Sequence, residues 1–212
     1  MSVFRFGIMG AGGIANKFCE AVSLLDNCEV CAISSKSYER AKSLATKYGI
    51  NKYYDNYAEM LKAEKPDCVY IAVTNNDHYR LTMMCAQRGI PVLCEKAMFQ
   101  NSDEAQKVFE VAARNKVFVM EAMWSRFLPA VNKAKMWIDK GEIGVPEISQ
   151  FSIGFKAVED NSNRFFNPLL GGGASKATLI GEDGNIYATH TTEYETISTI
   201  YPHPRCPLRG NC

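Results

Sequence analysis

A glycine-rich turn directly after an apolar strand is the feature that most constrains this chain. Residues 3–9 are largely apolar and lead straight into a G-x-G-x-x-A pattern at residues 10–15. Gly10 permits a tight turn out of the strand, and Gly12 lets the backbone approach a pyrophosphate. Ala15 allows the next helix to pack closely on the strand. The turn therefore predicts a dinucleotide whose phosphates lie at a helix N-terminus.

The segment after the glycines has the spacing of a helix. Its apolar side chains are expected to form one buried face over residues 14–25: Ile14, Phe18, Ala21, Val22 and Leu25. A strand before the motif and a helix after it favour a cofactor site over an ordinary glycine-rich turn. The cofactor-binding residues predicted here are Gly10, Gly12, Gly13 and Ile14.

Length and charge exclude several classes of protein. The 212 residues suffice for one well-buried domain and part of a second. The net charge of +1 argues against nucleic acid or an anionic membrane as partner. No apolar run approaches the ~20 residues of a membrane span, and the start lacks a signal peptide. We expect a soluble, cytoplasmic protein, with reduced, buried thiols at six of its eight cysteines: Cys19, Cys28, Cys31, Cys68, Cys85 and Cys94.

Strands and helices are expected to alternate as far as residue 121. The expected strands are 3–9, 28–33, 53–54, 68–73, 91–94 and 117–120. The expected helices are 14–25, 38–48, 58–64, 78–87 and 102–115, with residues 75–77 as the N-cap of the fourth. The run 68–73 is apolar almost throughout, which is typical of a strand buried on both faces of a parallel sheet. The pattern predicts an α/β fold, a doubly wound parallel sheet of the Rossmann type, over residues 1–121.

The pattern changes after residue 121. Residues 130–140 have helical spacing, and residues 147–157 alternate like a strand with one solvated face. Residues 177–187 read as a hairpin with Asp183-Gly184 at its turn. These segments predict an incomplete α+β domain with an antiparallel sheet over residues 122–212.

The residues after the second strand favour NADP over NAD. A carboxylate about 20 residues beyond the glycines is typical of NAD sites, but residues 34–37 here are Ser-Ser-Lys-Ser. Ser35 and Lys36 are expected to accept a 2′-phosphate, with Arg40 one helical turn further on as a second cation. The alternative is an ordinary solvated loop.

A lysine follows another apolar strand. Lys96, next to Glu95, is expected at the carboxyl end of a parallel strand, in the crevice where such sheets bind ligands. A cation there can stabilise a developing alkoxide and hold a substrate hydroxyl. The alternative is a solvated lysine at a strand end. His78 is equally open, either as a contact of the nicotinamide or its ribose or as a surface residue.

Four motifs together resemble the Gfo/Idh/MocA oxidoreductases, and within them the NADP-dependent dehydrogenases of sugars and cyclic diols. They are the turn at 10–15, the turn at 75–78, Cys94-Glu95-Lys96-Ala97, and residues 121–129. The resemblance covers residues 3–174 and implies hydride transfer between NADP and a sugar or diol. It also implies a homodimer formed through the second domain. By matching position, Lys96 takes the role of the family's Glu-Lys-Pro lysine, and Ala97 replaces the proline. The cofactor would also contact Asn75, His78, Glu95, Trp124 and Arg126, although Trp124 is most simply a core residue between domains.

The chain departs from the family after residues 171–174. There the family has a helix with an aspartate and, four residues later, a tyrosine or histidine that transfers a proton. In an alignment without gaps, these two positions are Ala177 and Gly181 in this chain, and neither side chain can transfer a proton. Asp183 and Tyr187 have the spacing, but the expected hairpin turn breaks the helix they need. An internal loss after Ala174 is the simplest explanation.

Two functions follow from these observations. The chain is interpreted as an NADP-dependent oxidoreductase with Lys96 as its catalytic residue. The alternative is a non-catalytic NADP-binding protein, as a sensor, a partner subunit or an inactive truncated form. No metal is expected, because His190, His203, Cys206 and Cys212 match no familiar zinc spacing.

Overall fold

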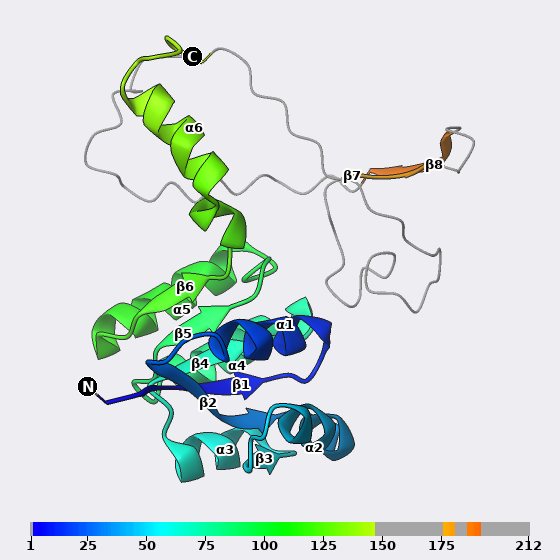
Figure 1. The fold of residues 1–212 in the computed structure, drawn as a ribbon, viewed down its shortest axis with the longest axis vertical. Coiled ribbons are helices and arrows are strands. Elements are labelled where there is room, and N and C mark those ends of the chain that lie inside the picture. Colours follow the sequence, from blue (N-terminus) through cyan, green and yellow to red (C-terminus); the bar gives the residue numbers. More distant parts are fainter. Residues whose placement is uncertain (1, 147–175, 181–185, 192–212) are drawn as a thin grey trace. The chain divides into compact units, whose positions relative to one another are not determined.

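The structure of the protein is a computed structural model that describes residues 2–146, 176–180 and 186–191. The chain divides into two compact units, Met1–Gly172 and Gly173–Cys212 (Figure 1). The strands of the first unit are β1 (Phe4–Met9), β2 (Cys28–Ser34), β3 (Tyr53–Tyr54), β4 (Cys68–Ile71), β5 (Val92–Cys94) and β6 (Val119–Glu121). Its helices are α1 (Gly13–Val22), α2 (Tyr38–Lys47), α3 (Tyr57–Glu64), α4 (Asn75–Ala86), α5 (Ser102–Asn115) and α6 (Pro129–Asp139), with a short 3₁₀ helix η1 (Trp124–Phe127).

The six strands form one parallel sheet in the order β3-β2-β1-β4-β5-β6. This is the strand order of a doubly wound, Rossmann-type sheet, so the predicted α/β fold is confirmed for this part of the chain. The order reverses between β1 and β4, which are neighbours in space but not in sequence. Ligands of such sheets bind at the carboxyl ends of the strands beside this reversal.

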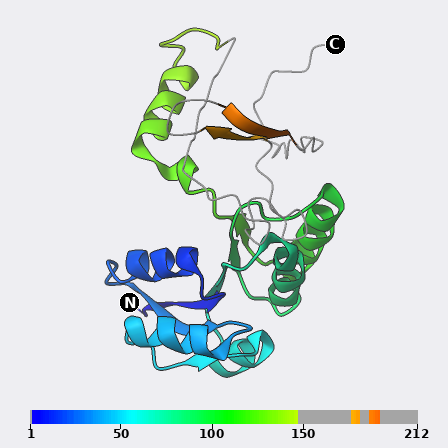
Figure 2. The same cartoon turned by 90° about the vertical axis from the view of Figure 1, so that its right-hand side faces the viewer.

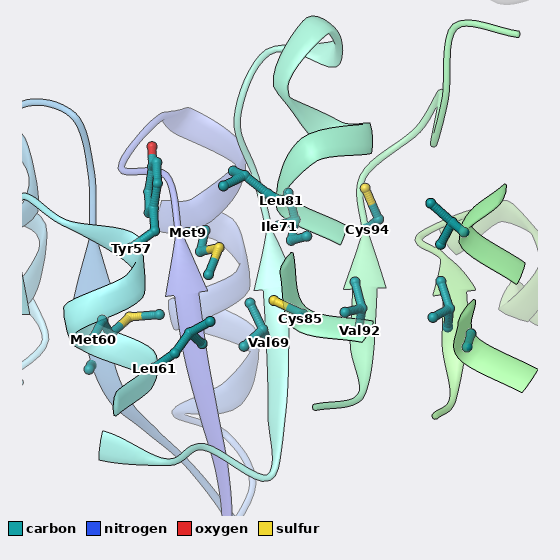
Figure 3. Packing of buried hydrophobic residues seen from close by; sticks show 14 residues of the cluster. Met9, Tyr57, Met60, Leu61, Val69, Ile71, Leu81, Cys85, Val92 and Cys94 are labelled. Carbon is teal, nitrogen blue, oxygen red and sulfur yellow. The ribbon is translucent and has the colours of Figure 1, made fainter. Parts of the chain in front are cut away.

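Two buried clusters lie on opposite faces of the sheet, and Figure 2 shows helices flanking the strands. Successive strand residues point to opposite faces, so Ile8 packs with α1 and α2 while Met9 packs with α3, α4 and α5. Figure 3 shows the cluster that contains Met9, in which Met60 of α3 and Leu81 of α4 cover β1, β4 and β5. Burial on both faces explains why the sequence of β4 is an unbroken apolar run.

Two local predictions are wrong. In α1 the buried face consists of Ala15, Cys19 and Val22, while Ile14 is 43% exposed. Ala15 packs in the cluster with Ile8, and Ile14 lies about 100° away around the helix axis, although Val22 and Phe18 of the predicted face do pack inward. Residues 75–77 do not cap α4 but form its first turn, since Thr74 is the N-cap and its side chain makes no capping hydrogen bond.

Beyond β6 the structure confirms the expected helix at 130–140 as α6, with Pro129 at the favoured first position. In the second unit, β7 (Lys176–Ile180) and β8 (Ile186–Thr191) pair antiparallel, as expected of a hairpin. The expected strand at 147–157 and the turn at Asp183-Gly184 lie outside the described residues. The antiparallel domain and the boundary after residue 121 therefore stay predictions. No helix in the described part of the chain is long and apolar enough to cross a membrane.

Replacing Gly10 with alanine should lower the stability of the protein. Gly10 has φ +113°, and a Cβ there would lie 2.2 Å from the carbonyl oxygen of Ala72. We expect the free energy of unfolding to fall on the order of 3 kcal/mol. Gly13→Ala is the matched control, because a Cβ there meets nothing within 4 Å and favours helix. Equal urea midpoints for the two variants would contradict the account.

Candidate active site

The predicted site residues lie in or just after the loops that follow the parallel strands, at the edge of the sheet formed by the carboxyl ends of the strands. Gly10, Gly12 and Gly13 follow β1, and Ser35 and Lys36 follow β2. Asn75 and His78 follow β4, and Glu95 and Lys96 follow β5. Trp124 and Arg126 follow β6 in η1. The sheet thus places residues that are more than 100 positions apart in sequence along a single edge.

The glycine turn has the geometry of a phosphate cradle. The Gly10 amide donates to the Ser34 carbonyl at 2.7 Å, which ties the end of β1 to the end of β2. Gly12 is the N-cap of α1, and no side chain caps the helix there. A Cβ at Gly12 or Gly13 would meet no atom within 4 Å, so the surface over the helix N-terminus is open. The open N-terminus and the helix dipole favour an anion at this position, and the binding of a pyrophosphate there stays a prediction.

The Glu95 side chain is fixed from the neighbouring strand. Tyr70 of β4 donates from its hydroxyl to Glu95 Oε1 at 2.6 Å, and the Lys96 amide donates to Glu95 Oε2 at 3.3 Å. Burial and this hydrogen bond raise the pKa of Tyr70, so its phenol stays protonated and remains a donor. Phe18 of α1 stacks on the Tyr70 ring with centroids 3.9 Å apart. These contacts hold the Glu95 carboxylate to β4 and to the Lys96 backbone, and Lys96 itself is exposed.

The carbonyl of Ala97 is held by α4. Asn75 Nδ2 lies 3.2 Å from the Ala97 oxygen, and His78 Nδ1 lies 2.9 Å from it. On the far side of the loop, the Met98 amide donates to Glu121 Oε1 at 2.8 Å. Residues 95–98 are therefore fixed by β4, α4 and β6 together. We refer to them as the lysine loop.

His78 is neither a surface residue nor free to contact a cofactor through its ring nitrogens. It is fully buried, and its Nε2 lies 3.2 Å from the Val73 oxygen while Nδ1 contacts Ala97. Both partners are acceptors, and a neutral imidazole donates from one nitrogen. Which of the two carbonyls receives a hydrogen bond depends on the tautomer of the ring. His78 is thus a positioning residue that joins the end of β4 to the lysine loop.

Lys36 forms an ion pair with Asp77 that the sequence did not predict. Its Nζ lies 2.5 Å from Asp77 Oδ2, and Arg80 Nη2 lies 3.2 Å from Asp77 Oδ1. Burial alone would raise the pKa of Asp77, but the hydrogen bonds and charges of Lys36 and Arg80 bring it below its ordinary value. The i,i+3 spacing of Asp77 and Arg80 was a readable signal for their own pairing. Nothing in the sequence predicted the long-range pairing with Lys36.

The other predicted cofactor residues have distinct surroundings. Ser35 is buried, and its hydroxyl accepts a hydrogen bond from the Ser37 amide at 3.2 Å. Arg40 is exposed in α2. Trp124 is 67% exposed in η1, and Arg126 is also exposed. Both predicted places of Trp124, in the core between the domains and beside the cofactor, stay predictions, because most of the second domain lies outside the described residues.

The cysteines of the described residues do not supply a nucleophile. Cys19, Cys68, Cys85 and Cys94 are buried, whereas Cys28 and Cys31 are only partly so, and all six are free thiols. Burial raises the pKa of the Cys19 and Cys68 thiols to about 11, and that of the Cys85 and Cys94 thiols to about 12. These four thiols are protonated at neutral pH and serve the packing of the core.

Comparison with protein families identifies the first part of the chain as an NAD-binding Rossmann domain of an oxidoreductase family. The sequence profile of a family described as "Oxidoreductase family, NAD-binding Rossmann fold" (GFO_IDH_MocA) matches residues 4–123. Trans-1,2-dihydrobenzene-1,2-diol dehydrogenase of Mus musculus is 31% identical over 94% of this chain and 65% of its own length. D-xylose 1-dehydrogenase (NADP(+)) of Hypocrea jecorina is 34% identical over 81% of this chain and 49% of its own length. The chain thus spans about one half to two thirds of these curated relatives.

Solved structures agree on the fold. A probable dehydrogenase from Thermotoga maritima superposes with a TM-score of 0.64 at 26% identity, covering 66% of this chain and 42% of its own. A 3-ketoreductase from Actinomadura kijaniata, in complex with TDP-benzene and NADP, gives 0.62 at 26% identity, covering 68% and 45%. An oxidoreductase from Agrobacterium radiobacter, solved with NAD+, L-tartaric acid and magnesium, gives 0.65 at 22% identity over 68% and 42%.

Removing the His78 ring should loosen the lysine loop selectively. His78→Ala removes the ring that joins the Val73 and Ala97 carbonyls and leaves a buried cavity, so we expect a loss of about 3 kcal/mol of stability. Amide exchange at residues 95–98 should also become faster relative to β1. Asn56→Ala, which removes the α3 cap, is the control and should cost about 1 kcal/mol without affecting that loop. Unchanged exchange at residues 95–98 in the His78 variant would contradict the positioning role.

Proposed function

Since this chain belongs to the Gfo/Idh/MocA oxidoreductase family, we propose that it transfers hydride between NADP and a CH–OH group of a sugar or cyclic diol. The observation that carries the proposal is the lysine loop, which fixes Lys96 at the carboxyl end of β5, on the same edge as the glycine turn. A cofactor cradle and an exposed cation on one edge are two of the parts that such a reaction requires, the third being a group that takes up or returns the hydroxyl proton.

Support for NADP comes from the end of β2. Ser35 and Lys36 stand where NAD-binding chains of this fold place a carboxylate, and Lys36 supplies a positive charge. The D-xylose dehydrogenase relative is NADP-dependent by name, and the 3-ketoreductase was solved with NADP. Another neighbour was solved with NAD+. The preference of this chain is therefore proposed from its own Lys36.

Each residue of the site has its own role in the proposed reaction. Gly10, Gly12 and Gly13 bind the pyrophosphate through backbone amides at the α1 N-terminus. The nicotinamide supplies the hydride acceptor or donor when the cofactor is bound. Lys96 holds the substrate hydroxyl and stabilises negative charge as it develops on that oxygen. Glu95, held by Tyr70, limits where the Lys96 backbone can move. Trp124 and Arg126 are proposed to border the nicotinamide.

One observation favours a second candidate, a non-catalytic NADP-binding protein. Ala177 stands where the resemblance places an aspartate on a helix, but it lies in β7 and pairs with His190 of β8. In a strand, two residues four positions apart lie on the same face but about 13 Å from each other, whereas a helix brings their Cβ atoms within about 6 Å. The cofactor cradle does not depend on that segment. A sensor, a partner subunit or an inactive truncated form would keep the cradle and lack turnover.

The remaining parts of the proposal concern assembly and location. By the same resemblance we propose an incomplete second domain with an antiparallel sheet over residues 122–212, and a homodimer formed through it. We also propose a small-molecule sugar or diol as partner and a cytoplasmic location.

NADPH should bind more tightly than NADH, and Lys36 should carry much of the difference. We expect Lys36→Gln to weaken NADPH about tenfold and to leave NADH nearly unchanged, because one charge-assisted hydrogen bond to the 2′-phosphate is lost. Fluorescence titration of the reduced cofactors measures both affinities. Lys42→Gln, an exposed lysine of α2, is the matched control. Equal losses for the two cofactors would contradict the role of Lys36.

Turnover separates the two candidate functions. The chain is screened for turnover with NADP against sugars and cyclic diols. If it is an enzyme, Lys96→Met should lower kcat by about 10²–10³ and leave the affinity for NADPH unchanged. Lys107→Met, an exposed lysine of α5, serves as control. Tight NADPH binding with no turnover on any substrate of the screen would favour the non-catalytic protein.

A further inference from the structure

We propose that Tyr70 of β4 is a positioning residue for the proposed reaction: its hydroxyl holds the Glu95 carboxylate to β4 and thereby keeps this anion from pairing with the Lys96 ammonium. Lys96 is then available to a substrate hydroxyl. The inference rests on the proposed function, because it concerns the cation that the reaction uses. The pairing of Lys96 can nevertheless be measured without any turnover.

A carboxylate directly beside a functional lysine competes with the substrate for that lysine. Glu95 precedes Lys96, and Glu95 Oε2 lies 3.3 Å from the Lys96 backbone nitrogen. An ammonium on a flexible four-carbon stem can reach a carboxylate that lies this close to its own backbone. Opposite charges within a few ångström attract each other. A paired Lys96 would have to leave Glu95 before it could bind a substrate oxygen.

Tyr70 gives the Glu95 carboxylate a different partner. The Tyr70 hydroxyl donates to Glu95 Oε1 at 2.6 Å, and the Glu95 amide donates to the Ile71 carbonyl at 2.9 Å. Both the side chain and the backbone of Glu95 are therefore tied to β4. Among the described residues, no ion pair includes Glu95 or Lys96, and Lys96 is exposed.

The donor itself is fixed in one orientation. Tyr70 is only 3% exposed, and the Phe18 ring of α1 stacks on it with planes 16° apart. Phe6 of β1 packs edge-on against Phe18 with centroids 5.2 Å apart. A ring held in this way has one direction in which its hydroxyl can donate. Tyr70 thus restricts the Glu95 carboxylate more than a solvated donor could.

A second tyrosine–glutamate pair shows why the orientation matters. Glu64 Oε1 accepts a hydrogen bond from Tyr54, but Glu64 Oε2 lies 3.8 Å from Arg5 Nη2 and forms an ion pair. At Glu95 the second oxygen accepts from the Lys96 backbone amide instead. Tyr70 therefore aligns the carboxylate so that its other oxygen meets a backbone amide. Without the hydroxyl this alignment is lost, and the carboxylate can turn to the ammonium.

The chemical reactivity of the Lys96 amine tests the inference. A lysine is acetylated as the free amine, and an opposite charge beside it favours the unreactive ammonium. We expect Tyr70→Phe to slow acetylation of Lys96 by a small activated ester about threefold, since the released carboxylate pairs with the ammonium. Mass spectrometry measures the rate at fixed pH, with the exposed Lys107 as internal reference. Tyr54→Phe is the matched control and should leave the Lys96 rate unchanged.

Two further variants make the result specific to Glu95. Glu95→Gln keeps the length of the side chain and an oxygen for Tyr70, so the Lys96 rate should stay within about a factor of two of the parent. Glu95→Gln added to Tyr70→Phe should restore the rate, because the amide carries no charge. Thermal melts check that each variant is folded. The single Glu95→Gln variant decides the inference even where Tyr70→Phe does not fold.

Three outcomes overturn the inference. A rise of about threefold in Glu95→Gln means that the carboxylate already pairs with Lys96 in the parent. An unchanged Lys96 rate in Tyr70→Phe means that the hydroxyl does not hold the carboxylate away. Slowing that persists in the double variant means that Glu95 is not its cause.

A turnover assay separates this inference from the proposed function. If the chain is an enzyme, Tyr70→Phe should raise the KM for the sugar or diol about threefold and leave kcat nearly unchanged, because Lys96 must first leave Glu95. An unchanged KM with a slowed acetylation would contradict the link to substrate binding. If the parent shows no turnover, the proposed reaction fails, and the acetylation rates alone decide whether Tyr70 keeps Glu95 from Lys96.

Discussion

The close approach of Gly10 to the end of β4 is the constraint on which the rest of this site depends. The chain leaves β1 with φ +113° at Gly10, where a side chain would collide with the Ala72 carbonyl. Since β1 and β4 are the pair at which the strand order reverses, this contact lies where sheets of this kind bind their ligands. The direction of α1 is set by the same turn. A residue larger than glycine at this position would disturb the cradle and the sheet together.

The lysine loop shows how rigidity can be supplied from outside a segment. The related family has proline after the lysine, whereas this chain has Ala97. Here the Ala97 carbonyl is held by Asn75 and His78, and Met98 is held by Glu121. Side chains of α4 and β6 therefore restrict the loop backbone, as the pyrrolidine ring of a proline would restrict it locally. The backbone next to Lys96 is thus held by contacts from residues distant in sequence, among them the buried His78.

The sequence was sufficient to predict the parallel sheet, because its strands are apolar runs and its helices have regular spacing. Four of its cofactor-side positions, Gly10, Gly12, Lys36 and Lys96, lie on the predicted edge because parallel strands bring their carboxyl ends together. Local patterns could not predict burial of a polar ring such as His78, since its two acceptors lie five and nineteen residues away.

The ion pairs of Asp77 were missed for a related reason. Its pairing with Lys36 spans 41 residues and exists only because β2 and β4 end on the same edge. The exposure of Ile14 was also missed, because helical spacing defines a stripe without saying which of two adjacent stripes faces the strand. Sequence patterns thus located the site, while its electrostatic partners required the fold.

Hydrogen–deuterium exchange with and without NADP tests the central claim most directly, that one edge of the parallel sheet is a preorganised NADP site. The account predicts protection of the amides at 10–14, 35–37 and 95–98 on addition of NADP, with β7 and β8 unaffected. The lysine loop should already exchange slowly without the cofactor, because three elements hold it. Rapid exchange of residues 95–98 in the free protein, or protection that spares the glycine turn, would contradict the account.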